Sequence, residues 1–222
     1  MVPQSFAGGY ADEHGTEAIM WRFEPLAGGL FPSYEIRSTV RGVGIRGCDF
    51  DGLEPVDALA AGKAGLSVDR SGDLTSCVLS GALPCTIEGP RGVQPCLVRF
   101  TLDLRQREES APGPAGNLRL SIEVEGATLE VADDWFEDGL LRLAAALPGG
   151  FRLRSCVTCL FADYSPGGHS LMGIRCHREG KAQYLAVRGK SDYWPVPVTE
   201  EVPETYLCGE FEPRVSGTGY RG

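Results

Sequence analysis

The chain has 222 residues, of which 42% are hydrophobic and 23% are charged, proportions that are ordinary for a soluble globular protein. Its formal net charge is −9, from 30 acidic and 21 basic side chains, and the basic residues form no stripe. A surface of this sign repels phosphate backbones, so nucleic acid is excluded as an expected partner. No apolar run approaches the roughly 20 residues that cross a bilayer, and we expect no membrane partner.

The N-terminal stretch MVPQSFAGGYADEHG has neither the basic region nor the apolar core of a signal peptide. We therefore expect a cytoplasmic protein in a reducing compartment. In such a setting the eight cysteines are interpreted as metal ligands, reactive thiols or small core residues before disulfides.

The first two-thirds of the chain predicts antiparallel strands, because apolar and polar side chains alternate along it. The clearest strands are expected at 34–40, 98–104 and 118–124, and shorter ones at 17–23, 66–69, 74–80 and 128–131. The proline- and glycine-rich stretch at 110–116 predicts an exposed hairpin loop. Strands at this spacing predict a sandwich or a curved sheet.

One principal helix is predicted at about 134–147, before Pro148. Asp134 followed by Glu137 indicates a capping box, and the acids of this first turn are explained by the helix dipole. The apolar stripe consists of Phe136, Leu140, Leu143 and Leu147. The fold class is therefore α+β and mainly antiparallel β. A body at 1–150 and a metal-binding segment at 151–222 are expected to form one continuous domain.

The segment after this helix contains the pair Cys156 and Cys159, spaced C-x-x-C, and then Cys176. Cys208 follows in the tail. A C-x-x-C turn presents two sulfurs to one ion, and two further thiolates complete a tetrahedron. We predict a structural zinc site in a C-terminal subdomain formed by these four cysteines, with iron as the alternative occupant.

Other interpretations of these residues stay open. Cys156 and Cys159 could form a redox dithiol, although the flanking residues indicate strand rather than a βαβ setting. His177 is the reserve ligand, since it adjoins Cys176 and neighbouring strand residues point to opposite faces. The strand region contains four further cysteines, which are interpreted as core residues: Cys48, Cys77, Cys85 and Cys96. The alternative is a second metal site formed by Cys77, Cys85 and Cys96.

Few side chains are candidates for catalysis, because the chain has only three histidines. His169 lies in a predicted loop with Pro166, Gly167 and Gly168 before it. The catalytic candidates, all close to the predicted metal site in the sequence, are Asp163, Tyr164, His169 and His177. No phosphate-binding loop, nucleophile elbow or dinucleotide fingerprint is present, and no cofactor besides the metal is expected.

Three segments carry a family resemblance: CVTCLFADYSPGGHSLMGIRCHR from Cys156, ETYLCGEFEPR from Glu204, and GTGYRG at the C-terminus. Together they resemble an uncharacterised family of about this length from Streptomyces and related bacteria. The earlier segments DEHGTEAIMW and IRGCDFDGLEP fit it as well. Where that family more often has cysteine-phenylalanine-arginine, this chain has His177 after Cys176. The resemblance implies an actinobacterial origin and no particular reaction.

We therefore expect a zinc-stabilised bacterial protein that is a non-catalytic binding or accessory protein for an unknown small molecule or protein. The alternative is a small-molecule tailoring or cyclising enzyme of bacterial secondary metabolism that uses the loop beside the metal. A third hypothesis is a redox protein that works through Cys156 and Cys159. The sequence leaves open whether the protein is an enzyme.

Overall fold

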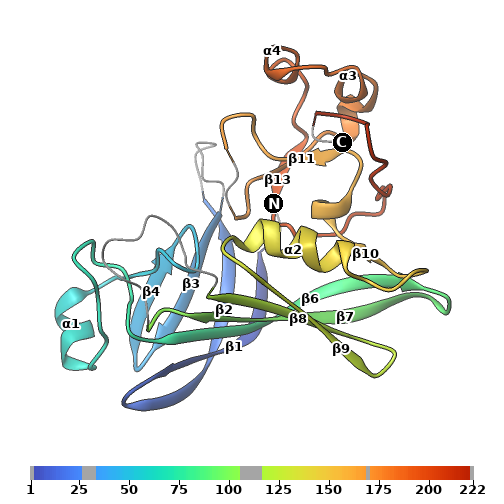
Figure 1. The fold of residues 1–222 in the computed structure, drawn as a ribbon. Helices are drawn as coiled ribbons and strands as arrows, with labels where there is room; N and C mark the ends of the chain where they lie inside the picture. Colours follow the sequence, from blue (N-terminus) through green and yellow to red (C-terminus); the bar gives the residue numbers. More distant parts are fainter. Residues whose placement is uncertain (1–2, 27–33, 106–116, 169–170, 221–222) are drawn as a thin grey trace.

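The computed structural model describes residues 3–26, 34–105, 117–168 and 171–220, which form two antiparallel sheets and several short helices (Figure 1). The larger sheet contains β1 (Gln4–Asp12), β2 (Gly15–Pro25), β3 (Tyr34–Val40), β4 (Val43–Gly47), β5 (Glu54–Pro55), β6 (Val78–Gly89), β7 (Gly92–Asp103), β8 (Leu118–Val124), β9 (Ala127–Asp133) and β10 (Arg152–Arg154). The smaller sheet contains β11 (Ala162–Asp163), β12 (Ile174–Cys176) and β13 (Glu200–Val202).

The helices are α1 (Ala58–Lys63), α2 (Phe136–Ala145), α3 (Lys181–Leu185) and α4 (Lys190–Tyr193), with single turns of 3-10 helix at η1 (Cys156–Thr158) and η2 (Arg178–Gly180). Antiparallel sheets with short helices agree with the predicted α+β class. The strands predicted at 34–40 and 118–124 have the observed bounds. The strand predicted at 66–69 is wrong, because Val68 forms only an isolated bridge with Leu74. The loop predicted at 110–116 lies outside the described residues.

The larger sheet is curved, and its strand order is β5-β4-β3-β2-β1-β6-β7-β8-β9, with β10 pairing to β6. In Figure 1 the strands β1–β4 stand steeply against β6–β9. β1 pairs with only the first third of β6, up to Gly81, and β10 pairs with the other end of β6 from Thr86. Pro84 lies in the gap between these partners, where the missing N–H of proline leaves no ladder bond unmade.

The core lies on the inner face of this curved sheet and is rich in aromatic rings. Trp21 of β2 donates a hydrogen bond of 2.8 Å from its indole Nε1 to the carbonyl of Ser80, and its ring contacts Phe50 edge-on. Two glycines make room for these rings. A Cβ at Gly8 would lie 2.1 Å from the Trp21 nitrogen, and one at Gly81 would lie 2.3 Å from the ring of Phe100.

Helix α2 crosses the inner face of the sheet and covers β8 and β9 (Figure 1). It starts later than predicted: its N-cap is Trp135, which makes no side-chain capping bond. The predicted capping box at Asp134 is therefore wrong. Asp133 accepts a bond of 2.7 Å from the backbone N–H of Asp134, in the turn that precedes the helix. Glu137 is not a solvated first-turn acid, because it is only 3% exposed.

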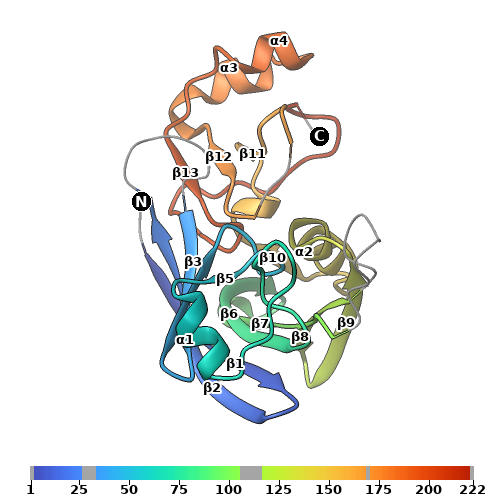
Figure 2. The same ribbon diagram turned by 90° about the vertical axis from the view of Figure 1, so that its left-hand side faces the viewer.

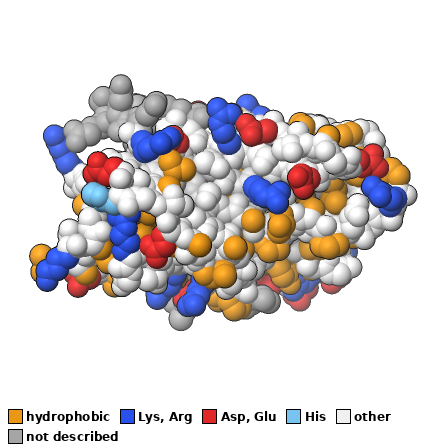
Figure 3. Space-filling model, turned by 90° about the horizontal axis from the view of Figure 1, so that it is seen from below, with side chains coloured by type: hydrophobic (Ala, Val, Ile, Leu, Met, Phe, Trp, Pro, Cys, Tyr) orange, Lys and Arg blue, Asp and Glu red, His pale blue; other side chains and the backbone are white. Residues whose placement is uncertain are grey.

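The residues after β10 build a small subdomain on the side of α2 that faces away from the larger sheet (Figure 2). Its sheet order is β11-β12-β13, and α3 and α4 lie at the far end. The buried apolar side chains form one continuous cluster that runs from the larger sheet through α2 into this subdomain. The opposite, outer face of the larger sheet carries charged side chains of both signs among apolar ones (Figure 3).

Candidate metal centre and the adjoining pocket

Three segments that are far apart in the sequence meet in the small subdomain. η1 carries Cys156 and is followed by Cys159, β12 ends at Cys176, and Cys208 lies in the tail after β13. The backbone N–H of Cys156 donates a hydrogen bond of 2.7 Å to the carbonyl of Tyr206 in that tail. β11 follows Cys159 and pairs with β12 at Cys176. Backbone pairing therefore holds all three cysteine-bearing segments together.

The thiols of these segments share one buried neighbourhood. Cys156, Cys159 and Cys176 are 3%, 5% and 4% exposed, and Cys208 is half-buried. Burial raises the pKa of the Cys156 thiol, and the neighbouring thiols of Cys159, Cys176 and Cys208 raise it further. Within the described part of the chain, however, no three His, Cys, Asp or Glu side chains are arranged as the ligands of a metal ion. Metal binding by these four cysteines stays a prediction.

The donor set suits a soft cation. Thiolates are the usual ligands of structural Zn²⁺ sites and of iron–sulfur sites, and a bound cation lowers the free-energy cost of ionising a buried thiol. A permanent positive charge is already present: Nη1 of Arg178 lies 3.7 Å from Sγ of Cys176 and also pairs with Glu200. Burial raises the pKa of the Cys176 thiol, and the Arg178 guanidinium opposes that effect.

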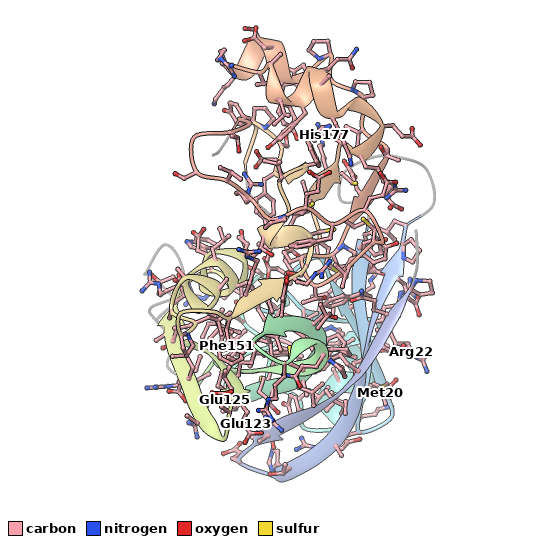
Figure 4. All side chains as sticks on the ribbon, turned by 90° about the vertical axis from the view of Figure 1, so that its right-hand side faces the viewer. Met20, Arg22, Glu123, Glu125, Phe151 and His177 are labelled. Carbon is pink, nitrogen blue, oxygen red and sulfur yellow. The ribbon has the colours of Figure 1, made fainter. Side chains whose placement is uncertain are left out.

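His177 is fully buried in the small subdomain, and Figure 4 shows it well away from the labelled residues of the larger sheet. Its Nδ1 lies 2.9 Å from the carbonyl of Pro197, which can only accept, so Nδ1 carries the proton. Its Nε2 then accepts from the hydroxyl of Tyr193 at 2.8 Å. The ring stacks on Tyr184 with 5.0 Å between centroids. Both ring nitrogens are therefore engaged within the fold.

Asp163 is the last residue of β11 and Tyr164 follows it, and both side chains are buried. The Asp163 carboxylate accepts from the Tyr184 hydroxyl at 2.8 Å and from the backbone N–H of Tyr164 at 2.9 Å. Nη1 of Arg214 lies 3.9 Å from the same carboxylate. His169, the remaining predicted candidate, lies outside the described residues.

A buried carboxyl group that the sequence analysis did not single out is Glu204, which is 1% exposed. Tyr164 donates to it through its hydroxyl at 3.0 Å, and the backbone N–H of Met172 donates to both of its oxygens at 2.9 Å. Burial raises the pKa of Glu204 to about 8.

Two other acids outside this cluster are also affected by burial, which raises the pKa of Glu137 and raises that of Asp49 to about 7. No local pattern distinguishes these acids from solvated ones.

A pocket of about 180 Å³ lies between α2 and the small subdomain. Its lining residues are Leu141, Val157, Ala162, Asp163, Tyr164, Ile174 and Arg214. Two predicted candidates, Asp163 and Tyr164, therefore border a cavity. Val157 belongs to the C-x-x-C turn between Cys156 and Cys159, so this cavity directly adjoins the cysteine cluster.

The remaining cysteines are dispersed. Cys85 and Cys96 lie directly opposite each other on β6 and β7, and burial raises the pKa of Cys96 to about 11. Cys77 lies just before β6, and Cys48 is exposed. Cys85 lies eight positions after Cys77 along extended chain, roughly 26 Å at 3.3 Å per residue. The alternative metal site from Cys77, Cys85 and Cys96 is therefore wrong.

Among the described residues, no helix is long and apolar enough to cross a membrane. Comparison with curated proteins and with solved structures yields no match. A family model does match residues 4–162, which include the larger sheet, α2 and the C-x-x-C turn. Cys176 and Cys208 lie beyond the matched residues. Since the match spans most of the 222 residues, the chain belongs to DUF6304, a family of unknown function.

Proposed function

We propose that this protein is stabilised by one structural Zn²⁺ held by Cys156, Cys159, Cys176 and Cys208, and that it is a non-catalytic binding or accessory protein. The observation that supports this proposal is the shared neighbourhood of the four thiols, in which Cys159, Cys176 and Cys208 all lie close enough to affect the ionisation of Cys156. Four thiolates would leave no position for water or substrate on the ion, which favours a structural role. Iron is the less favoured occupant.

The position of the cluster explains what such an ion would stabilise. Within its described residues, the small subdomain has three short strands and several short helices, so little regular backbone bonding holds this part together. Cys208 belongs to the tail, whereas Cys156 and Cys159 belong to the segment next to α2. An ion shared by these segments would contribute its binding free energy directly to folding.

Metal analysis of the purified protein, combined with thermal unfolding, tests this proposal. We expect about one zinc per chain, and a loss of both zinc and folded structure on chelation or in the Cys156→Ser/Cys159→Ser variant. Cys48→Ser is the matched control, because Cys48 is exposed and lies outside the cluster. A protein without stoichiometric zinc would overturn the site, and a double variant that unfolds like the wild type would overturn its structural role.

A second candidate function is a small-molecule tailoring or cyclising enzyme, favoured by the pocket that Asp163 and Tyr164 border. Under this hypothesis the loop that contains His169 would supply a further polar group. Loss of turnover in a His169→Ala variant that retains its zinc would support the enzyme hypothesis, and unchanged turnover would count against a role for His169. Actinobacterial origin, a role in secondary metabolism and a cytoplasmic location are part of the proposal.

A further inference from the structure

The pocket between α2 and the small subdomain combines an apolar wall with one positively charged side chain. Leu141 of α2, Val157 of the C-x-x-C turn and Ile174 of β12 contribute apolar surface from three separate elements. Arg214 contributes a guanidinium from the C-terminal tail. An apolar body with a few fixed polar groups is the usual composition of a small-molecule site.

The contacts that hold Arg214 in place use only some of the N–H donors of its guanidinium. Its backbone N–H donates to the carbonyl of Thr158 at 3.0 Å, which fixes the tail at this point. Its side chain donates to the carbonyl of Ala162 and lies 3.9 Å from the Asp163 carboxylate. A guanidinium has five N–H donors, so donors remain for a further acceptor.

The carboxylate of Asp163 is itself occupied and buried. It accepts hydrogen bonds from Tyr184 and from the backbone of Tyr164, and its side chain is 2% exposed. The side chain of Arg214 is more accessible, at 21% exposed. Asp163 therefore orients the guanidinium, while the accessible charge at the pocket is the positive one.

We propose that this pocket binds a small organic carboxylate with an apolar body, which deepens and rests on the binding role proposed above. The carboxylate head pairs with the guanidinium of Arg214 through the charge-assisted, two-point geometry that arginine favours. The body lies against Leu141, Val157 and Ile174.

The cavity volume limits the size of this ligand. A cavity of about 150 Å³ holds benzene, so about 180 Å³ holds a single ring or a branched chain of similar bulk. Inorganic phosphate lacks the apolar body that the walls require, and an acid with two or more rings would extend out of the pocket. Benzoate is a probe of the right size and charge.

The ligand would contact the predicted metal centre through one residue. Val157 lies between Cys156 and Cys159, so a bound ligand packs against the turn that carries two of the proposed zinc ligands. We expect the ligand to slow zinc loss to a chelator, because it binds the form in which this turn is folded.

Titration of the full chain with benzoate, followed by NMR shifts of backbone amides, tests the proposal. We expect saturable shifts confined to the pocket, with a dissociation constant near or below about 1 mM. The neutral analogue benzyl alcohol should bind at least about tenfold more weakly, because it cannot form the charged pair. Equal binding of both probes would overturn the carboxylate class.

Two variants locate the interaction. Leu141→Trp fills the pocket from the partly exposed face of α2 and should abolish benzoate binding, whereas Val93→Trp, at an exposed apolar residue distant in the sheet, should not. Arg214→Gln should weaken benzoate binding about tenfold and leave benzyl alcohol unaffected. Unchanged benzoate affinity in a folded Leu141→Trp protein would overturn the site.

Zinc content is measured on the same samples, so that the two proposals fail separately. A protein with one zinc per chain and no saturable benzoate shift would overturn the pocket proposal alone. A protein without zinc that binds benzoate in the expected pocket would overturn the metal site and leave the pocket standing.

Discussion

The hydroxyl group of Tyr164 donates a hydrogen bond of 3.0 Å to the carboxyl group of Glu204, and both side chains are buried. The backbone N–H of Met172 donates to the same carboxyl group at 2.9 Å. Glu204 thus connects the residues after β11, the residues before β12 and the segment after β13. Within the small subdomain, this one acid therefore joins three separate stretches of the chain through hydrogen bonds.

Ionisation of Glu204 should make the protein less stable as the pH rises. Burial raises the pKa of Glu204 to about 8 in the folded protein, against 4.5 in the unfolded chain. Below 4.5 both states are protonated, whereas between the two values the unfolded state loses its proton first. The contribution of this group is therefore lost as the pH rises through the folded pKa, and denaturant unfolding should show a falling free energy of unfolding from about pH 5 to pH 8.5.

Glu204→Gln is the control for this pH dependence, because the amide oxygen still accepts from Tyr164 and cannot ionise. We expect the variant to lose much less stability over the same pH range. The remaining slope would come from Asp49, whose pKa is raised to about 7, and from Glu137, whose pKa is also raised by burial. An identical slope in the wild type and the variant would contradict the assignment to Glu204.

Replacement of Glu137 by methionine should stabilise the protein. Oε2 of Glu137 is buried and has no hydrogen-bond partner among the described residues, and burial raises the pKa of the group. The negative charge of Glu137 also contributes to the raised pKa of Glu204. Methionine keeps an unbranched chain of similar size without the desolvated carboxyl, so we expect a gain of about 1 kcal/mol in unfolding free energy, larger at pH 8 than at pH 5. Lower stability at both pH values would contradict this account.

The strands of the larger sheet were predictable where alternation is uninterrupted. In Tyr34–Val40 the buried residues recur at every second position, as half-buried antiparallel strands require. β1 was missed because Gly8 and Gly9 interrupt that alternation, although Gly8 is required there by the ring of Trp21. The short strands of the small subdomain, with two or three residues each, carry no detectable period.

The sequence indicated the four cysteines and, beside the pocket, Asp163 and Tyr164. The C-x-x-C spacing singled out Cys156 and Cys159, and Cys176 and Cys208 were included because they follow in the C-terminal segment and supply the two further thiolates of a tetrahedron. Glu204 and Arg214 were not found, because an isolated acid or base in a tail normally indicates a solvated residue. The burial of Glu204 and the position of Arg214 at the pocket depend on tertiary packing that no local pattern encodes.

Gly8→Ala should destabilise the protein severely. A Cβ at this position would lie 2.1 Å from Nε1 of Trp21 and 2.5 Å from the carbonyl oxygen of Ser80, which is backbone and cannot move aside easily. Displacement of the indole would also break its hydrogen bond to Ser80. We expect a loss of about 3 kcal/mol or more in unfolding free energy, measured by denaturant titration.

The matched control is Gly62→Ala in α1, where an added Cβ meets no atom within 4 Å. Alanine favours the helix over glycine by roughly 0.5–1 kcal/mol, so this variant should be slightly more stable than the wild type. Similar losses in both variants would show that the contact with Trp21 does not explain the effect at Gly8.

Alkylation of the native protein should modify Cys48 well before the other cysteines. Cys48 is exposed, whereas burial raises the pKa of Cys77 to about 12 and leaves Cys156 strongly protonated. The thiolate is the reacting species, so both access and ionisation disfavour the buried thiols. Iodoacetamide labelling followed by peptide mass spectrometry should therefore show one early adduct, which Cys48→Ser abolishes. Labelling of Cys156 and Cys159 as fast as that of Cys48 would contradict the proposed four-cysteine zinc site and favour a redox dithiol at the C-x-x-C turn.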